Sequence, residues 1–308
     1  MRYDCVMDQF PSAPVPKQAW LIVNTHSRRG RKLFRRARRR LRDAGIGIER
    51  AIAVRKPADL NLRVADAIAA GAKMVIVGGG DGTISGAVDG FVESDAVFAL
   101  LPLGTANSFA RTLGIPLDLD GAIEVIAHGR RARIDLGAVN GDYFANVAAI
   151  GMPSIIGASI PDGLKRVLGR GGYMLWALWC LVKFRPFDVR LNTGRGTELR
   201  FRAVELRIAN GSYLGGTQVA EDAAVDSGDL LIQVVTGGGR LRLGWNWLAT
   251  ALRLPARRHT VETVRGREVR ITTDPPLPIS IDGEVTARTP LTASVAKGVL
   301  EVVVPAPV

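Results

Sequence analysis

The chain has 308 residues, of which 47% are hydrophobic and 23% are charged, an ordinary composition for a globular protein with one large or two medium domains. Its formal net charge of +12 is unusual and indicates an anionic partner, which could be a nucleic acid, an acidic lipid surface or a phosphorylated substrate. Two cysteines and three histidines, none at metal-ligand spacing, exclude a disulfide framework and a Cys-rich zinc site.

The tail and the apolar segments of the chain predict where the protein works. Residues 1–18 carry prolines and scattered charges and are expected to form a flexible tail without a signal sequence, which favours a cytoplasmic location. No apolar run reaches the roughly 18–20 residues that a membrane-spanning helix needs. The longest, residues 173–182, is expected to be a core helix, and a helix lying at a membrane interface is the alternative.

Strands and helices alternate between residues 19 and 132. We expect strands at residues 19–23, 48–54, 73–77 and 97–101, and helices at residues 31–42, 59–70 and 84–91. Gly45 is expected to end the first of these helices. The alternation predicts a parallel α/β nucleotide-binding domain over residues 19–132, with ligands at the carboxyl ends of its strands.

Residues 133–308 follow a different pattern, in which short β-rich segments are separated by Gly, Asn-Gly, Asp-Gly and Pro turns. The expected strands are residues 132–139, 143–150, 188–191, 201–209, 230–236, 269–273, 277–281 and 299–303. The pattern predicts an antiparallel β-sandwich domain with helical insertions near residues 164–184 and 241–254. The last strand could return to the first domain.

A buried strand that stops at Gly78-Gly-Gly-Asp-Gly-Thr83 is the most informative segment. Glycines let the backbone turn sharply and approach a ligand, and a turn that leads into a helix presents N–H groups to an anion. Asp81 in this turn could hold a metal bound to phosphates or accept a proton. A dinucleotide fingerprint and a P-loop both fail to fit. A tight turn without a ligand is the alternative.

Two more strands of the first domain end in small polar residues, at 24–30 and at 104–107. The ends of adjacent parallel strands converge on one crevice, so the three turns together favour a phosphate or nucleotide site. In the second half, Asp282 and Glu284 flank a glycine. They could sit on a turn near an active site, and a plain Asp-Gly hairpin turn is the alternative.

Four ordered motifs carry a resemblance to a known family. They are Gly78 to Thr83, the segment 101–116 with Gly104-Thr-Ala-Asn107, the segment 210–216, and Ile281-Asp-Gly-Glu284. From about residue 19 to its end the chain resembles the diacylglycerol kinase catalytic family, which includes bacterial lipid kinases and sphingosine kinases. That family is more distantly similar to NAD kinase and phosphofructokinase.

The resemblance implies an N-terminal α/β domain, a C-terminal β-sandwich domain and an interdomain cleft that binds ATP and Mg²⁺. It implies phosphorylation of a lipid hydroxyl, on diacylglycerol or a sphingoid-like lipid, within phospholipid biosynthesis. The residues implied to contact the nucleotide are Asn24, Ser27, Arg28, Gly79, Gly80, Asp81, Gly82, Thr83, Gly104, Thr105 and Asn107.

Carboxylates would supply the catalytic chemistry that the resemblance implies. Asp282 and Glu284 are expected to provide the general base toward the lipid hydroxyl, and Asp81 to belong to the Mg²⁺-phosphate network. Asp226 and Asp229 match the region of a structural Mg²⁺ site in the family.

The chain also departs from the family pattern. Ser85-Gly86 stands where Asn-Glu is usual, Ser108 where aspartate is often found, and Thr25 where proline is usual. The first two changes remove carboxylates, so an altered kinase is an open alternative.

Residues 28–42 hold ten Lys or Arg out of fifteen. A solvated helix face is the usual fate of such a run, but an anionic membrane surface would attract it and favour peripheral association. Arg28 and Arg29 could instead reach ATP phosphates. No specific nucleic-acid contact is expected, because no nucleic-acid motif is present. The alternatives to a lipid kinase are a kinase of a soluble substrate such as NAD and a non-catalytic lipid- or nucleic-acid-binding relative; a homodimer is left open.

Overall fold

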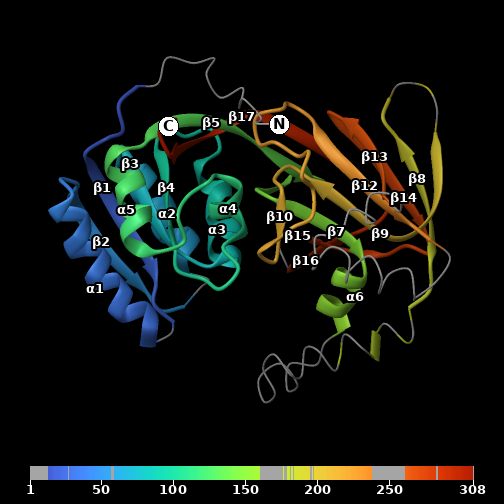
Figure 1. Cartoon of the computed structure of the whole chain (residues 1–308), viewed down its shortest axis with the longest axis horizontal. Helices are drawn as coiled ribbons and strands as arrows, with labels where there is room; N and C mark the ends of the chain where they lie inside the picture. The colour runs from blue at the N-terminus through green and yellow to red at the C-terminus, as the bar shows by residue number, and fades with distance from the viewer. Residues whose placement is uncertain are drawn as a thin grey trace. The chain divides into compact units, whose positions relative to one another are not determined.

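The computed structural model describes residues 13–26, 28–56, 59–159, 176, 179–180, 182, 184–194, 196, 198–237, 261–281 and 284–307 (Figure 1). The chain divides into two compact units. The first comprises Met1–Leu136, Ala224–Gly228 and Ala296–Val308, and the second comprises Gly137–Ala223 and Asp229–Val295. The helical insertion expected at 241–254 and most of the one expected at 164–184 lie outside the described residues.

A parallel sheet forms the centre of the first unit. Its strand order is β2-β1-β3-β4-β17. The strands are β1 (Gln18–Asn24), β2 (Gly47–Val54), β3 (Met74–Gly79), β4 (Val97–Pro102) and β17 (Leu291–Val304). Every residue of β3 and β4 is buried, as expected for strands that are covered on both faces.

Helices cover this sheet in two groups. They are α1 (Arg28–Asp43), α2 (Asp59–Ala69), α3 (Asp81–Val88), α4 (Ser108–Thr112) and α5 (Leu119–His128), with a 3₁₀ turn, η1 (Asp89–Phe91), after α3. The chain reaches β2 on one side of β1 and β3 on the other, so right-handed crossovers place α1 and α2 on opposite faces. α1 packs with α5, and α2 packs with α3.

The buried carboxylate of Asp135 joins the three chain segments of the first unit. It lies in β5 (Arg130–Val139), a strand that begins in this unit and ends in the second. Oδ2 accepts a hydrogen bond from the N–H of Gly228 at 2.7 Å, and Oδ1 accepts one from the N–H of Gly298 at 2.8 Å. Both glycines have a positive φ, which residues with a Cβ rarely adopt. The late segments are thereby fixed to the early one.

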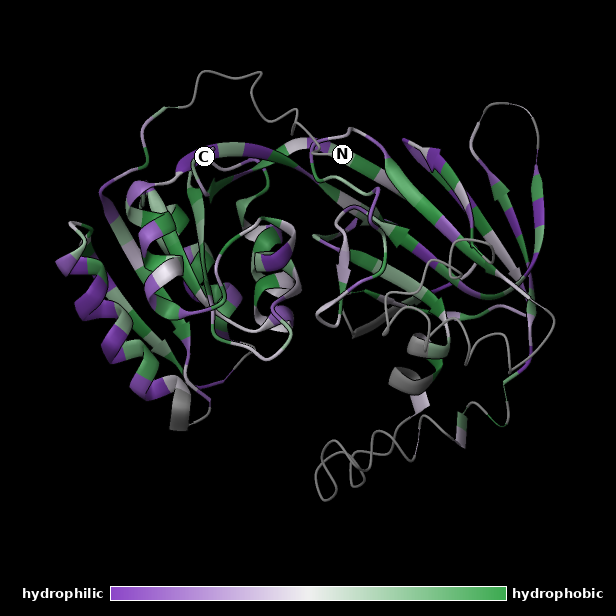
Figure 2. Cartoon of the chain, viewed as in Figure 1, coloured by the Kyte–Doolittle hydropathy of each residue, from purple (hydrophilic) through white to green (hydrophobic). Residues whose placement is uncertain are grey.

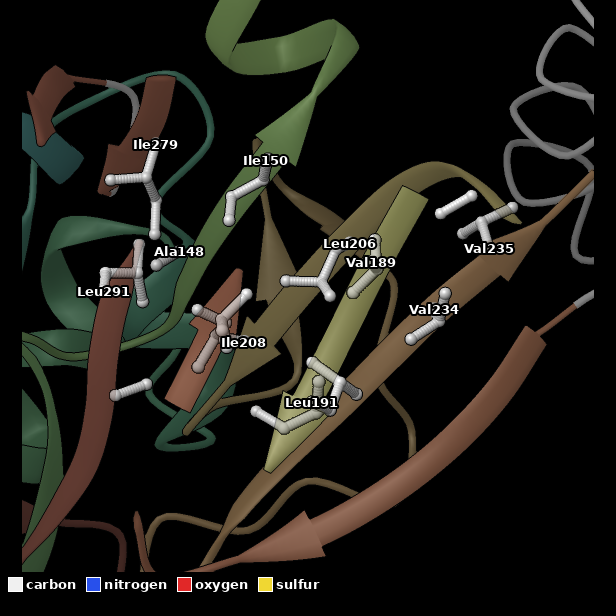
Figure 3. Packing of buried hydrophobic residues seen from close by; sticks show 14 of the residues in the cluster. Ala148, Ile150, Val189, Leu191, Leu206, Ile208, Val234, Val235, Ile279 and Leu291 are labelled. Atoms are coloured by element: carbon white, nitrogen blue, oxygen red, sulfur yellow. The ribbon is translucent and has the colours of Figure 1, made fainter. Parts of the chain in front are cut away.

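The second unit consists mainly of antiparallel strands. They are β6 (Asp142–Phe144), β7 (Val147–Gly151), β8 (Phe187–Asn192), β9 (Leu199–Ala209), β10 (Tyr213–Leu214), β11 (Thr217–Gln218), β12 (Leu230–Thr236), β13 (Val261–Gly266), β14 (Glu268–Asp274), β15 (Pro278–Ile281) and β16 (Glu284–Arg288). The helix α6 (Met152–Ser159) follows β7, and the described residues 176, 179–180 and 182 are also helical. Leu206 and Ile208 of β9 pack with Val189 and Leu191 of β8 in a buried apolar core (Figure 3).

Most expected elements are present, with some differences. The strand expected at 143–150 is two strands, because the carbonyl of Asn146 turns to accept hydrogen bonds from the N–H groups of Asn210 and Gly211. The last strand begins at Leu291, well before residue 299. The elements that were not expected are the helices α4, α5 and α6 and the strands β10, β11, β13 and β16. In the segment 173–182, Cys180 lies in the buried apolar core and Trp176 packs against that core, whereas Trp179 and Val182 are 46% and 58% exposed, so its described residues have one buried face and one exposed face.

Candidate nucleotide-binding site

The carboxyl ends of β1 and β3 meet at the point where the strand order reverses. The chain leaves β1 toward β2 and later returns to β3 on the other side of β1. Open α/β sheets bind ligands at such a switch point. Here the Nδ2 group of Asn24, at the end of β1, donates a hydrogen bond to the Oγ1 atom of Thr83 at 3.0 Å. Two residues predicted to contact the nucleotide are therefore brought together across the switch point.

The glycine-rich turn passes directly into α3. The helix begins at Asp81 and not at residue 84, because the carbonyl of Gly80 already accepts hydrogen bonds from the N–H groups of Thr83 and Ile84, at 2.9 and 3.1 Å. Gly80 has no side chain to cap the helix. Thr83 and Ile84 use their N–H groups in these bonds, so among the described residues the N–H groups of Asp81 and Gly82 stay open to an anion, which the helix dipole also favours.

The second glycine loop packs directly on the first. A Cβ atom built on Gly104 would lie 2.5 Å from the Cα atom of Gly80, which no real contact allows. The N–H of Leu103 also donates to the carbonyl of Gly79 at 2.9 Å. The sequence predicted a sharp turn and close approach of a ligand at such glycines. The structure adds that glycine at 80 and 104 lets the two loop backbones touch.

The side chain of Asn107 holds the second loop in shape. Its Oδ1 atom accepts from the N–H of Gly104 at 2.9 Å, and its Nδ2 group donates to the carbonyls of Gly104 and Pro102 at 3.1 and 3.4 Å. The residue is 7% exposed and has a φ of 48°. Its amide hydrogens are used within the loop, which gives Asn107 a positioning role, and its nucleotide contact stays a prediction. Gly104 and Thr105 are exposed on the same loop.

The half-buried carboxylate of Asp81 links the two loops. Its Oδ1 atom accepts a hydrogen bond from the backbone N–H of Ser108, the first residue of α4, at 2.6 Å. Asp81 therefore caps α4, a structural role that the sequence did not reveal. Among the described residues, its Oδ2 atom has no hydrogen-bond partner. Mg²⁺ in nucleotide sites is usually held by one or two carboxylates and by phosphate, so Oδ2 beside the open end of α3 fits that donor set.

A small recess lies beneath these loops, lined by Gly80, Asp81, Ile84, Leu100 and Phe109 among others. It is too small to admit a water-sized molecule. A bound phosphate chain would therefore lie over the loops, against the exposed Gly82 and the half-buried Thr83, and not beneath them.

The first loop shows why threonine replaces proline at position 25. The N–H of Thr25 donates to the carbonyl of Val54 at 2.7 Å, and its hydroxyl donates to the same oxygen at 3.0 Å. Proline could make neither bond. The Oδ1 atom of Asn24 accepts from the N–H of His26 at 3.0 Å, which orients its amide toward Thr83. Ser27 lies outside the described residues, as does the side chain of Arg28.

The predicted catalytic pair belongs to the second unit. β15 and β16 pair antiparallel with Ile281 opposite Glu284, so Asp282 and Gly283 connect the two strands of a hairpin. Asp282 lies outside the described residues, and only the backbone of Glu284 is described. The catalytic role of the pair stays a prediction.

The second predicted metal site has a competing partner. The Oδ1 atom of Asp229 accepts a hydrogen bond from Nη1 of Arg265 at 2.8 Å. Nowhere in the described part of the chain do three His, Cys, Asp or Glu side chains gather as a metal site. Mg²⁺ binding by Asp226 and Asp229 therefore stays a prediction.

Two protein-family models together cover most of the chain. Residues 18–139 match the diacylglycerol kinase catalytic domain, and residues 147–304 match the YegS C-terminal NAD kinase beta sandwich-like domain. The chain is 33% identical over 287 residues to a protein of Chromohalobacter salexigens named "Probable lipid kinase YegS-like", with 91% of each chain covered. It is 30% identical over 287 residues to a diacylglycerol kinase of Staphylococcus epidermidis, with 89% of this chain and 88% of that one covered.

Solved structures share the fold. A crystal structure of a diacylglycerol kinase from Bacillus anthracis has a TM-score of 0.72 at 21% identity and covers 94% of this chain and 97% of its own. A yeast NADH kinase complexed with NADH has a TM-score of 0.51 at 11% identity, covering 95% and 88%. The predicted fold, an NAD-kinase-like α/β domain and an antiparallel β-sandwich, is confirmed.

Proposed function

The chain belongs to the diacylglycerol kinase catalytic family, and we propose on that premise that it transfers the γ-phosphate of ATP to a hydroxyl group of a lipid at a membrane surface. One observation carries the proposal. The Asn24–Thr83 hydrogen bond closes the switch point beside the uncapped start of α3, where the backbone N–H groups of Asp81 and Gly82 can receive phosphate oxygens. The names of the relatives support a lipid as the acceptor.

The proposed reaction is an in-line phosphoryl transfer. The lipid hydroxyl oxygen forms a bond to the γ-phosphorus, the bond from that phosphorus to the bridging oxygen breaks, and ADP leaves. The hydroxyl proton passes to a carboxylate, for which we propose the pair Asp282 and Glu284. The first turn of α3 holds the phosphates, and Asp81 presents Oδ2 to a cation. Mg²⁺, when bound, would neutralise charge on the transferred phosphate.

Exposed apolar residues support action at a bilayer surface. Trp179 and Val182 are 46% and 58% exposed, and Arg185 nearby in the sequence is exposed as well. A tryptophan and an aliphatic side chain next to a basic residue are typical of segments that lie at a membrane interface. No helix of the described residues has the length and apolar character that crossing a bilayer requires. We therefore propose peripheral association.

A lipid panel tests the proposed function. The purified full chain is incubated with γ-labelled ATP, Mg²⁺ and detergent-dispersed diacylglycerol, monoacylglycerol or a sphingoid base, and labelled product is separated from ATP. Label on at least one lipid is expected. Label on NAD and on no lipid would identify a kinase of a soluble substrate. No transfer to any acceptor, with ATP binding intact, would identify a non-catalytic relative.

A further inference from the structure

The helix α1 presents a face of exposed basic side chains (Figure 2, where most of its ribbon is purple). Four of them follow a spacing of four, three and four residues, which places them in one row along the helix. They are Arg31, Arg35, Arg38 and Arg42, and Lys32 and Arg39 lie seven residues apart in the adjacent row. All six are exposed, and no acidic partner contacts them in the described part of the chain.

The opposite side of α1 is fixed to the first unit. Ala37 and Leu41 are fully buried, and the helix packs on β1 and β2. The basic face must therefore point away from the sheet. Its like charges repel one another, and Asp43 is the one carboxylate that the helix itself contains. An anionic surface would relieve this repulsion.

Two further arginines of α1 are already paired. Nη2 of Arg36 and Nε of Arg40 donate to Asp120 of α5 at 2.5 and 2.9 Å. The hydrogen bond from Arg40, together with the charges of Arg36 and Arg40, holds the pKa of the Asp120 carboxyl below its usual value against a smaller opposing effect of desolvation. Asp120 therefore keeps its negative charge at neutral pH and neutralises one edge of the helix. Arg36 and Arg40 are paired with it, and the six exposed basic side chains named above are not.

We propose that the exposed basic face of α1, made of Arg31, Lys32, Arg35, Arg38, Arg39 and Arg42, docks the protein on an anionic lipid bilayer. The partner rests on the proposed function, because a kinase of membrane lipids must reach them in a bilayer. A row of cations on a rigid helix complements a plane of lipid headgroup charge. Each basic residue near an anionic leaflet strengthens binding by about fivefold.

Vesicle sedimentation with charge variants tests the docking face. The full chain is mixed with neutral phosphatidylcholine vesicles or with vesicles that also contain phosphatidylserine. Wild type is expected to bind the anionic vesicles only. The triple variant Arg35→Gln, Arg38→Gln and Arg42→Gln should bind them about 100-fold more weakly, and Asp120→Asn, which frees two arginines, should bind roughly fivefold more tightly or better.

A matched control separates a docking face from the overall charge. The control variant carries Arg190→Gln in β8, Arg267→Gln in the turn before β14 and Arg270→Gln in β14, and so removes three exposed charges from the second unit. This control should keep vesicle binding within about threefold of wild type. An equal loss of vesicle binding in the control and in the α1 variant would overturn the proposal. So would a protein that binds a DNA fragment but shows no preference for anionic over neutral vesicles.

Kinase assays in neutral detergent micelles keep the two proposals apart. There the α1 variant should phosphorylate lipid as fast as wild type, and its circular dichroism and thermal unfolding should match wild type. Vesicle binding that follows the charges of α1 in a protein that phosphorylates nothing would support docking and refute the function. Normal lipid phosphorylation with vesicle binding unaffected by the triple variant would refute docking alone.

Discussion

Replacing Asp81 by two different residues should separate its two roles. Asparagine keeps an oxygen that can accept the Ser108 N–H bond, now 2.6 Å long, but removes the charge at Oδ2. Alanine removes both. We therefore expect Asp81→Asn to lower turnover at least about 100-fold, the usual scale for losing a metal or electrostatic contact, with little change in stability.

The stability of Asp81→Ala follows from the lost cap on α4. A hydrogen bond to a charged acceptor contributes about 1.5–3 kcal/mol, so this variant should lose about 2 kcal/mol of unfolding free energy, against less than about 1 kcal/mol for Asp81→Asn. Denaturant unfolding measures the free energy, and steady-state kinetics with saturating ATP measures the turnover.

Asp118 provides a matched control for a helix cap away from the loops. Its Oδ1 atom accepts from the N–H of Gly121 at 2.8 Å at the start of α5. Asp118→Ala should cost about 1 kcal/mol of stability and leave turnover unchanged. The reasoning fails if Asp81→Asn keeps wild-type turnover, or if Asp81→Ala is as stable as wild type.

Three further variants test other contacts of the first unit. Gly104→Ala should force the loops apart, because its Cβ would meet the Cα atom of Gly80 at 2.5 Å; a raised KM for ATP checks this, and an unchanged KM would contradict it. Asn107→Ala should lower kcat/KM for ATP by up to about 100-fold through misplacement of the loop, with partial rescue in Asn107→Asp, which still accepts the Gly104 bond. Asp135→Ala should cost about 3 kcal/mol or more in denaturant unfolding, because two buried N–H groups lose a charged acceptor; a loss below about 1 kcal/mol would show that water replaces it.

The local parts of the fold could be predicted from the sequence because their signals are short-range. Apolar runs that end at glycine, proline or small polar residues predicted the strands β1, β3 and β4, and the spacing of the apolar residues predicted α1. The glycine turn also predicted the place of the candidate site, since a buried strand that leads through small residues into a helix is typical of an anion-binding turn.

The remaining features depend on contacts between distant residues. Arg36 and Asp120 are 84 residues apart, so no local pattern could pair them. Asp81 caps a five-residue helix, α4, that is too short to show a periodic pattern. Strand order was equally invisible, and without it the bond between Asn24 and Thr83 could not be located at a switch point.

The hydrogen bonds of Asp135 to Gly228 and Gly298 show that the first unit is assembled from early and late segments of the chain. While the ribosome is still translating, residues up to 136 emerge without the strand that borders β4 and without the two amides that satisfy Asp135. A prematurely terminated polypeptide therefore carries an open sheet edge at β4 and a carboxylate without its two backbone donors, and an open edge strand is a liability. The half that would receive nucleotide can mature only after the last strand has been synthesised.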